Sequence, residues 1–166
     1  MEKSPKNYDV LIIGAGPAGA NAAISYKNLN PNLTVGLVDK AAFPRDKSCG
    51  DAIGPGVISA LKRFNNEHIL DGEPQVVSTT LYGPDNIGIQ NYIPEVKNKE
   101  DSIVYVIPRV DLDNRILDLA KECGVDVYEG YNFVDFTSNL DKSLNVQIKN
   151  ENENLEFLTK ILVGAD

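Results

Sequence analysis

Residues 8–19 read YDVLIIGAGPAG, and this stretch decides the fold. The apolar run Tyr8–Ile13 predicts a parallel strand that is buried on both faces. Residues 17–29 favour a helix, because proline is tolerated in the first turn and alanine has the highest helix propensity. Thr34–Asp39 predicts a second buried strand. Residues 8–39 therefore form one βαβ unit, the repeating element of an α/β fold with a parallel sheet.

A glycine-rich loop joins the first predicted strand to the helix. It fits the pattern G-x-G-x-x-G and comprises Gly14, Ala15, Gly16, Pro17, Ala18 and Gly19. Gly14 permits a tight turn, Gly16 lets the backbone approach a diphosphate, and Gly19 lets the helix pack closely on the strand. The N–H groups and positive dipole at the start of a helix attract phosphates. Because the motif lies between a strand and a helix, it predicts a dinucleotide site rather than an ordinary glycine turn.

An acidic residue, Asp39, ends the second predicted strand, 20 residues after Gly19. At this position a carboxylate accepts hydrogen bonds from the hydroxyls of an adenosine ribose, and its charge repels a 2′-phosphate. NADP is therefore disfavoured. FAD and NAD share this fingerprint, so the glycines and Asp39 leave both dinucleotides open.

The bulk composition limits the classes to which the protein can belong. Its 166 residues, 42% of them hydrophobic, suffice for one globular domain with a core. A formal net charge of -8 argues against a broad contact with nucleic acid. Cys49 and Cys123 form no CxxC pair or Cys/His cluster, so no metal site is predicted. The sequence shows no signal peptide or membrane span, so we expect a cytoplasmic protein with reduced thiols, and contact with a membrane surface stays open.

The rest of the chain adds a β-rich excursion and a second helix. Short β-prone runs within about 72–107 predict an antiparallel excursion away from the nucleotide-binding core. Residues 109–123 favour a helix that Gly124 ends. Val125–Tyr128 is expected to rejoin the parallel sheet, and residues 133–165 read as a three-strand meander. The sequence stops at Asp166 directly after an apolar strand, which favours a fragment of a larger fold.

Residues 43–51, FPRDKSCGD, resemble a loop of the geranylgeranyl reductases and related prenyl-chain reductases, which belong to the aromatic-hydroxylase-like FAD superfamily. In that family a basic, proline-containing loop with Cys-Gly-Asp follows the acidic strand end, and residues 39–51 match it closely. Ala52 departs from the pattern, since related sequences often carry glycine there. Two further stretches resemble the superfamily: 108–116 is similar to its R-x-x-[FL]-D-x-x-[LI] helix start, and 162–166 to the start of its GADG motif.

The resemblance implies FAD as the cofactor and assigns roles around it. The loop 47–51 would run beside the isoalloxazine ring, with Cys49 on the reaction side, although a free cysteine that fills a gap in the loop is the alternative. Arg109 would contact the FAD phosphates. Arg45 would either offset flavin or phosphate charge or be solvated, as basic loop residues usually are. Asp113 is expected to satisfy backbone donors in the first turn of its helix rather than bind the cofactor. The predicted cofactor-binding residues are Gly14, Gly16, Pro17, Ala18, Gly19, Asp39, Lys40, Arg45, Cys49, Gly50, Asp51, Arg109 and Asp166. No catalytic residue is assigned.

The predicted fold is thus a Rossmann-like α/β FAD-binding domain with a parallel sheet, a β-meander and an antiparallel excursion. Residues 1–166 would be its N-terminal part, with the excursion directed toward a substrate domain. The resemblance implies an FAD-dependent oxidoreductase that reduces isoprenoid carbon–carbon double bonds, with electrons from a nicotinamide or ferredoxin donor. Two alternatives stay open. One is monooxygenation or halogenation of an aromatic substrate, and the other is an incomplete FAD-binding module that is inactive on its own.

Overall fold

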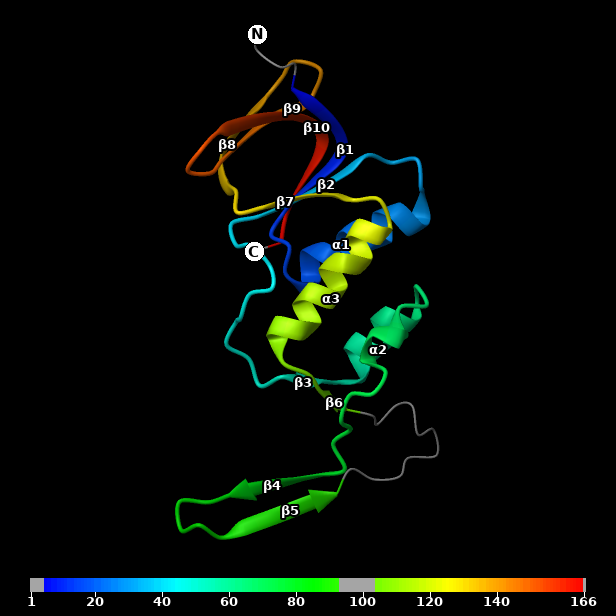
Figure 1. The fold of residues 1–166 in the computed structure, drawn as a ribbon, viewed down its shortest axis with the longest axis vertical. Coiled ribbons are helices and arrows are strands. Elements are labelled where there is room, and N and C mark those ends of the chain that lie inside the picture. Colours follow the sequence, from blue (N-terminus) through cyan, green and yellow to red (C-terminus); the bar gives the residue numbers. More distant parts are fainter. Residues whose placement is uncertain (1–4, 93–103, 166) are drawn as a thin grey trace. The chain divides into compact units, whose positions relative to one another are not determined.

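The computed structural model describes residues 5–92 and 104–165 (Figure 1). The chain divides into two compact units, Met1–Asp46 with Asp113–Asp166, and Lys47–Leu112. Among the helices within the described residues, none is both long and apolar enough to cross a membrane.

The described part of the first unit is built on a sheet with the strand order β7-β2-β1-β10-β9-β8. Its strands are β1 (Lys6–Ile13), β2 (Val35–Asp39), β7 (Asp126–Glu129), β8 (Asn132–Ser138), β9 (Leu144–Lys149) and β10 (Asn154–Gly164). The pairs β7–β2, β2–β1 and β1–β10 are parallel, whereas β10–β9 and β9–β8 are antiparallel. The predicted parallel sheet and the predicted meander are therefore both present, joined in one sheet.

Strand β10 makes this join. Its first half pairs with β9 in antiparallel fashion, and from Phe157 to Gly164 it also runs parallel to β1, in the register Lys6↔Phe157 to Ile13↔Gly164. Figure 1 shows the red β10 beside the dark blue β1. The sequence predicts the third strand of the meander but not its pairing with β1.

Helix α1 (Pro17–Leu29) packs against β1 and β2 through small residues. Gly19, Ala20 and Ala23 are buried there together with Ile24. On the sheet, a methyl group at Gly36 would lie 2.7 Å from Leu11 Cδ1, so glycine is needed for close packing. A buried cluster continues the core from the parallel strands into the meander: Tyr8, Leu11, Val38, Val146, Ile148 and Phe157.

The second unit contains the predicted antiparallel excursion. Its described elements are β3 (Ala52–Ile53), α2 (Pro55–Lys62), a 3-10 turn at Glu67–Leu70, β4 (Ser78–Tyr82), β5 (Gly88–Tyr92) and β6 (Tyr105–Val106). β4 pairs with β5 and β3 with β6, both antiparallel. Residues 93–103 of the predicted excursion lie outside the described residues. Helix α3 (Arg109–Glu122) follows, and Gly124, at φ +80, comes directly after its final turn as predicted.

Candidate functional site

The glycine loop closes the carboxyl end of β1. Gly14 has a φ of +104, a conformation that favours glycine, and its N–H donates to the Val38 carbonyl at 2.7 Å. A methyl group at Gly19 would overlap the carbonyl oxygen of Gly14. These two glycines are therefore required by the folded chain itself, as the sequence predicts for the turn and for the close packing of helix on strand.

The start of α1 is suited to a phosphate. Gly16 is the N-cap residue, Pro17 begins the helix, and the first turn carries no acidic side chain. The first N–H groups of a helix have no acceptor within it, and Ala18 and Gly19 supply such groups here. A methyl group at Gly16 would approach only the guanidinium of Arg45, at 3.4 Å. The space above Gly16 thus suits a diphosphate, which needs a close backbone approach and positive charge.

The Asp39 carboxylate lies at the end of β2 and is only 8% exposed. Its Oδ2 accepts a hydrogen bond from the Ala15 N–H at 2.7 Å, and its Oδ1 accepts one from the Ala41 N–H at 2.8 Å. Each carboxylate oxygen has a second acceptor site for a ligand hydroxyl. Asp39 therefore ties the glycine loop to the loop after β2, a structural task that the sequence does not predict.

Arg45 lies at the glycine loop. Its Nη1 is 3.4 Å from Oδ2 of Asp113, and its guanidinium carbon is 4.9 Å from the centre of the Phe43 ring. Its other terminal nitrogen, Nη2, faces Gly16. The ion pair of Arg45 with Asp113 is not predicted by the sequence, which expects Asp113 to satisfy backbone donors.

The last residue of β7 and the segment after it hold the loop that carries Arg45. Glu129 accepts a hydrogen bond from the Phe43 N–H at 2.7 Å through Oε2 and pairs with Lys121 at 3.0 Å through Oε1. The Tyr131 N–H donates to the Asp39 carbonyl at 3.0 Å. Since β7 is the parallel neighbour of β2, its carboxyl end reaches the same edge of the sheet as Asp39.

A pocket of about 270 Å³ opens at this edge. Its lining includes Gly14, Asp39, Lys40, Tyr131, Asn132 and Phe133. Lys40 lines this pocket together with Asp39. Tyr131 and the first two residues of β8, Asn132 and Phe133, are missing from the sequence-based site. The signal that could have found them is topological, because residues that follow a parallel strand next to β2 must come to this edge.

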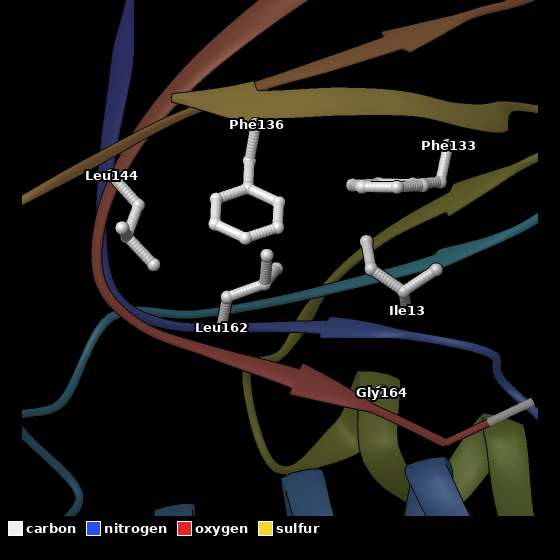
Figure 2. A pocket seen from close by; sticks show the side chains of 6 residues that line it. All are labelled: Ile13, Phe133, Phe136, Leu144, Leu162 and Gly164. Atoms are coloured by element: carbon white, nitrogen blue, oxygen red, sulfur yellow. The ribbon is translucent and has the colours of Figure 1, made fainter. Parts of the chain in front are cut away.

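A second pocket of about 400 Å³ is apolar and lies between the meander and the carboxyl ends of β1 and β10. Figure 2 shows the rings of Phe133 and Phe136 opposite the side chains of Ile13 and Leu162, with Leu144 at one side. Phe133 and Ile13 line both pockets. The polar pocket at Asp39 and the apolar pocket are therefore adjacent.

The predicted residues of the second unit form a group of their own. Asp51 has a φ of +54, and its Oδ1 accepts a hydrogen bond from the Arg109 N–H at 3.3 Å. Cys49 is exposed, and its thiol has a lowered pKa because the Asp51 N–H and then the Arg109 side chain hydrogen-bond to the sulfur. A Cβ at Gly50, which lies between Cys49 and Asp51, would have no atom within 4 Å other than those of Gly50 and its two neighbours in the chain.

The structure thus collects the predicted residues into two groups. The first unit brings Gly14, Gly16, Pro17, Ala18, Gly19, Asp39, Lys40 and Arg45 to one edge of the sheet. The second unit brings together Cys49, Gly50, Asp51 and Arg109. Asp166, the remaining predicted residue, lies outside the described residues.

A βαβ unit with a glycine turn at a helix start and a carboxylate at the next strand end defines a dinucleotide-binding protein of the Rossmann type. The chain belongs to the FAD binding domain family, which matches residues 7–166. FAD is therefore the cofactor, and the choice that the glycines leave open is settled against NAD.

The chain is similar to two curated relatives and to a solved structure. It is 33% identical to the menaquinone reductase of Mycolicibacterium smegmatis over 129 residues, which are 78% of this chain and 30% of the relative. It is 26% identical to the digeranylgeranylglycerophospholipid reductase of Picrophilus torridus over 162 residues, or 96% of this chain and 39% of the relative. This second relative confirms the predicted resemblance to geranylgeranyl reductases.

The solved structure is the myxobacterial chondrochloren halogenase CndH, an FAD-dependent halogenase. The TM-score is 0.79 and the identity 23%, and the match covers 98% of this chain and 38% of the halogenase. This likeness concerns the fold. The chain spans between 30% and 39% of the length of these three proteins.

Proposed function

We propose that the first unit binds the ADP half of FAD, with the diphosphate over the glycine loop and the ribose at Asp39. One observation carries this proposal: the Arg45 guanidinium faces Gly16 at the start of α1, where the helix offers N–H donors and no acidic side chain. A planar guanidinium and backbone N–H groups together match the charge and the oxygens of a diphosphate.

The adenine would enter the pocket at the edge of the sheet. This pocket is adjacent to Asp39, as an adenine attached to a ribose at Asp39 requires. Tyr131 and Phe133 supply apolar surface for a flat ring, and Asn132 and the backbone supply polar groups for its edge. Lys40 also lines the pocket.

The second unit would serve the flavin half of FAD. The Cys49–Asp51 loop is exposed or half-buried, and the Arg109 side chain hydrogen-bonds to Cys49. The loop can therefore approach an anionic or electron-rich ligand. The described hairpin β4–β5 would extend the excursion toward the substrate. In this reading residues 1–166 are the N-terminal part of an FAD-binding domain, and the residues that complete the flavin and substrate sites belong to the longer proteins of the family.

The reaction that we propose is reduction of isoprenoid carbon–carbon double bonds. When bound, FAD supplies the hydride chemistry, and the residues of the chain bind and orient the cofactor. The digeranylgeranylglycerophospholipid reductase among the relatives supports this substrate class, as does the Cys-Gly-Asp loop at Cys49. A nicotinamide or ferredoxin donor would supply the electrons.

Halogenation or monooxygenation of an aromatic substrate is the second candidate. The fold of the chondrochloren halogenase matches 98% of this chain, so the fold alone favours neither reaction.

Cofactor binding is tested by titrating the protein with FAD and, separately, NAD, with flavin fluorescence and calorimetric heat as readouts. Saturable binding of FAD that Gly16→Val abolishes and Arg109→Ala weakens supports the proposed site. Binding that survives Gly16→Val contradicts the placement of the diphosphate. If the 166-residue chain binds neither dinucleotide, the same titration of the whole protein decides between an incomplete site and a misplaced one.

The reaction is tested with the whole protein, loaded with FAD and reduced. Saturation of prenyl double bonds, followed by mass spectrometry, supports the reductase. Oxygen-dependent hydroxylation or halogenation of an aromatic compound, with the prenyl chain untouched, supports the second candidate. Turnover by the 166 residues alone would contradict the hypothesis of an incomplete module.

A further inference from the structure

Asp113 is a buried carboxylate on α3. The residue is 1% exposed and its side chain is completely covered. A buried carboxylate is stable only when positive charge or hydrogen-bond donors face it. The guanidinium of Arg45, whose side chain is 18% exposed, faces it at 3.4 Å. The pair therefore joins the covered side of α3 to the loop that follows β2.

Two contacts hold the Arg45 guanidinium, and its remaining terminal nitrogen faces Gly16. Nη1 faces Asp113, Nη2 faces Gly16, and the ring of Phe43 lies 4.9 Å from the guanidinium carbon. Glu129 in turn accepts a hydrogen bond from the Phe43 N–H. Because a guanidinium is planar, holding one terminal nitrogen and one face sets the direction of the other terminal nitrogen. That direction is toward the glycine loop.

We propose that Asp113 is a positioning residue for cofactor binding: it holds Arg45 at Gly16 so that the guanidinium meets the diphosphate of FAD, and it does not touch FAD itself. This inference rests on the proposed function of the first unit. Asp113 belongs to the R-x-x-[FL]-D-x-x-[LI] helix start, where the sequence predicts only an aspartate that satisfies backbone donors of the helix.

Simple electrostatics and a positioning role predict opposite changes in FAD affinity for Asp113→Asn. The substitution removes a negative charge near a bound dianion, so Coulomb repulsion alone would make FAD bind more tightly. If Asp113 acts by orienting Arg45, the loss of the ion pair frees the guanidinium and FAD binds more weakly. We expect the second result, with the dissociation constant of FAD raised about 10-fold.

A double-mutant cycle tests this inference. FAD is titrated, by quenching of flavin fluorescence, into the wild-type protein, Asp113→Asn, Arg45→Ala and the variant with both substitutions, in the form of the protein that binds FAD. Each single substitution should weaken binding, and the double variant should bind no more weakly than Arg45→Ala, because Asp113 acts through Arg45. Asp118→Asn is the matched control: it removes the same charge from the same helix at a side chain that is 51% exposed, and it should leave the affinity unchanged.

Two measurements separate positioning from folding. The urea unfolding midpoint of each variant shows whether Asp113→Asn folds. Arg45→Lys tests the positioning role without changing the buried Asp113, because lysine keeps the positive charge but lacks the planar fork of the guanidinium. Unchanged FAD affinity in both Asp113→Asn and Arg45→Lys would overturn the inference and leave the proposed function standing. The inference would also be overturned if Asp113→Asn weakened FAD binding by the same factor in the wild-type protein and in the Arg45→Ala variant. A wild-type protein that binds no FAD would contradict the proposed function, and this inference with it.

Discussion

The Asp39 carboxylate is hydrogen-bonded to the glycine loop that it faces, with 2.7 Å between its Oδ2 and the Ala15 nitrogen. Its other oxygen holds the Ala41 N–H. The acidic residue of the nucleotide fingerprint therefore has two tasks in this protein. It fixes the loop over which the diphosphate is proposed to lie, and its remaining acceptor sites are proposed to bind the ribose hydroxyls.

Replacement of Asp39 should consequently destabilise the protein even without FAD. Asp39→Ala leaves two backbone N–H groups without their acceptor in a buried place, and we expect the free energy of unfolding to fall by ~2–4 kcal/mol. Asp39→Asn keeps one acceptor and should cost less. Urea denaturation of the cofactor-free protein measures both, and Asp141→Asn, at an exposed turn carboxylate that accepts local N–H and O–H bonds, is the control. A role limited to ribose binding would leave the stability of the cofactor-free Asp39→Ala variant unchanged.

The glycines of the loop should separate into two kinds. Gly19→Ala forces a methyl group into the Gly14 carbonyl, so it should lower the free energy of unfolding by about 3 kcal/mol or more. At Gly16 a methyl group only touches Arg45, so Gly16→Ala should change stability by less than about 1 kcal/mol but weaken FAD binding at least ~10-fold. Unfolding midpoints and FAD titrations of both variants check this. Equal loss of stability in the two variants would contradict it.

Part of the loss of folding stability in acid should come from protonation of Asp9. Lys160 and then the Thr34 N–H hold the pKa of this carboxyl at about 2, below its ordinary value of 3.8. Since the folded pKa is the lower one, the stabilisation is complete above about pH 4 and is lost as the pH falls toward 2. Asp9→Asn should therefore flatten the dependence of the urea midpoint on pH in this window. Lys160 is 76% exposed, so added salt should reduce the difference between the two proteins.

The two thiols should differ in reactivity. The pKa of Cys49 is lowered by the Asp51 N–H and by Arg109, whereas burial raises the pKa of Cys123. More thiolate at neutral pH and full exposure should make Cys49 the faster site of alkylation by iodoacetamide, measured by mass spectrometry. Arg109→Ala should slow the reaction at Cys49 and leave Cys123 unaffected. Faster labelling of Cys123 would contradict this assignment.

Local patterns were sufficient to predict the βαβ unit and a dinucleotide site on it, but not the choice between FAD and NAD. The helix Pro17–Leu29 matches the predicted span, and the spacing from Gly19 to Asp39 is encoded within one continuous stretch. The antiparallel excursion and the meander were likewise visible as short β-prone runs. These features depend on residues that are near one another in the chain, so their signals are local.

The features that the sequence missed all join distant segments. The register of β1 with β10, the ion pair of Arg45 with Asp113, and the approach of Tyr131 to Asp39 each depend on how separate elements meet. An aspartate in a helix reads as a solvated or capping residue until the fold covers it. Sequence spacing carries no such information.

The pairing of β1 with β10 also sets an order of events during synthesis. The Ala165 N–H donates to the Ile13 carbonyl, next to Gly14, and Gly19 packs near the Ala165 side chain. The glycine loop lies near the start of the chain, yet β10, which pairs with the strand before this loop, is encoded some 150 residues later. Contacts of such high contact order form slowly, and a nascent chain that carries β1, α1 and β2 exposes one edge of β1 until β10 leaves the ribosome. The glycine loop would then be among the earliest parts of the protein to be made and among the last to acquire its final shape.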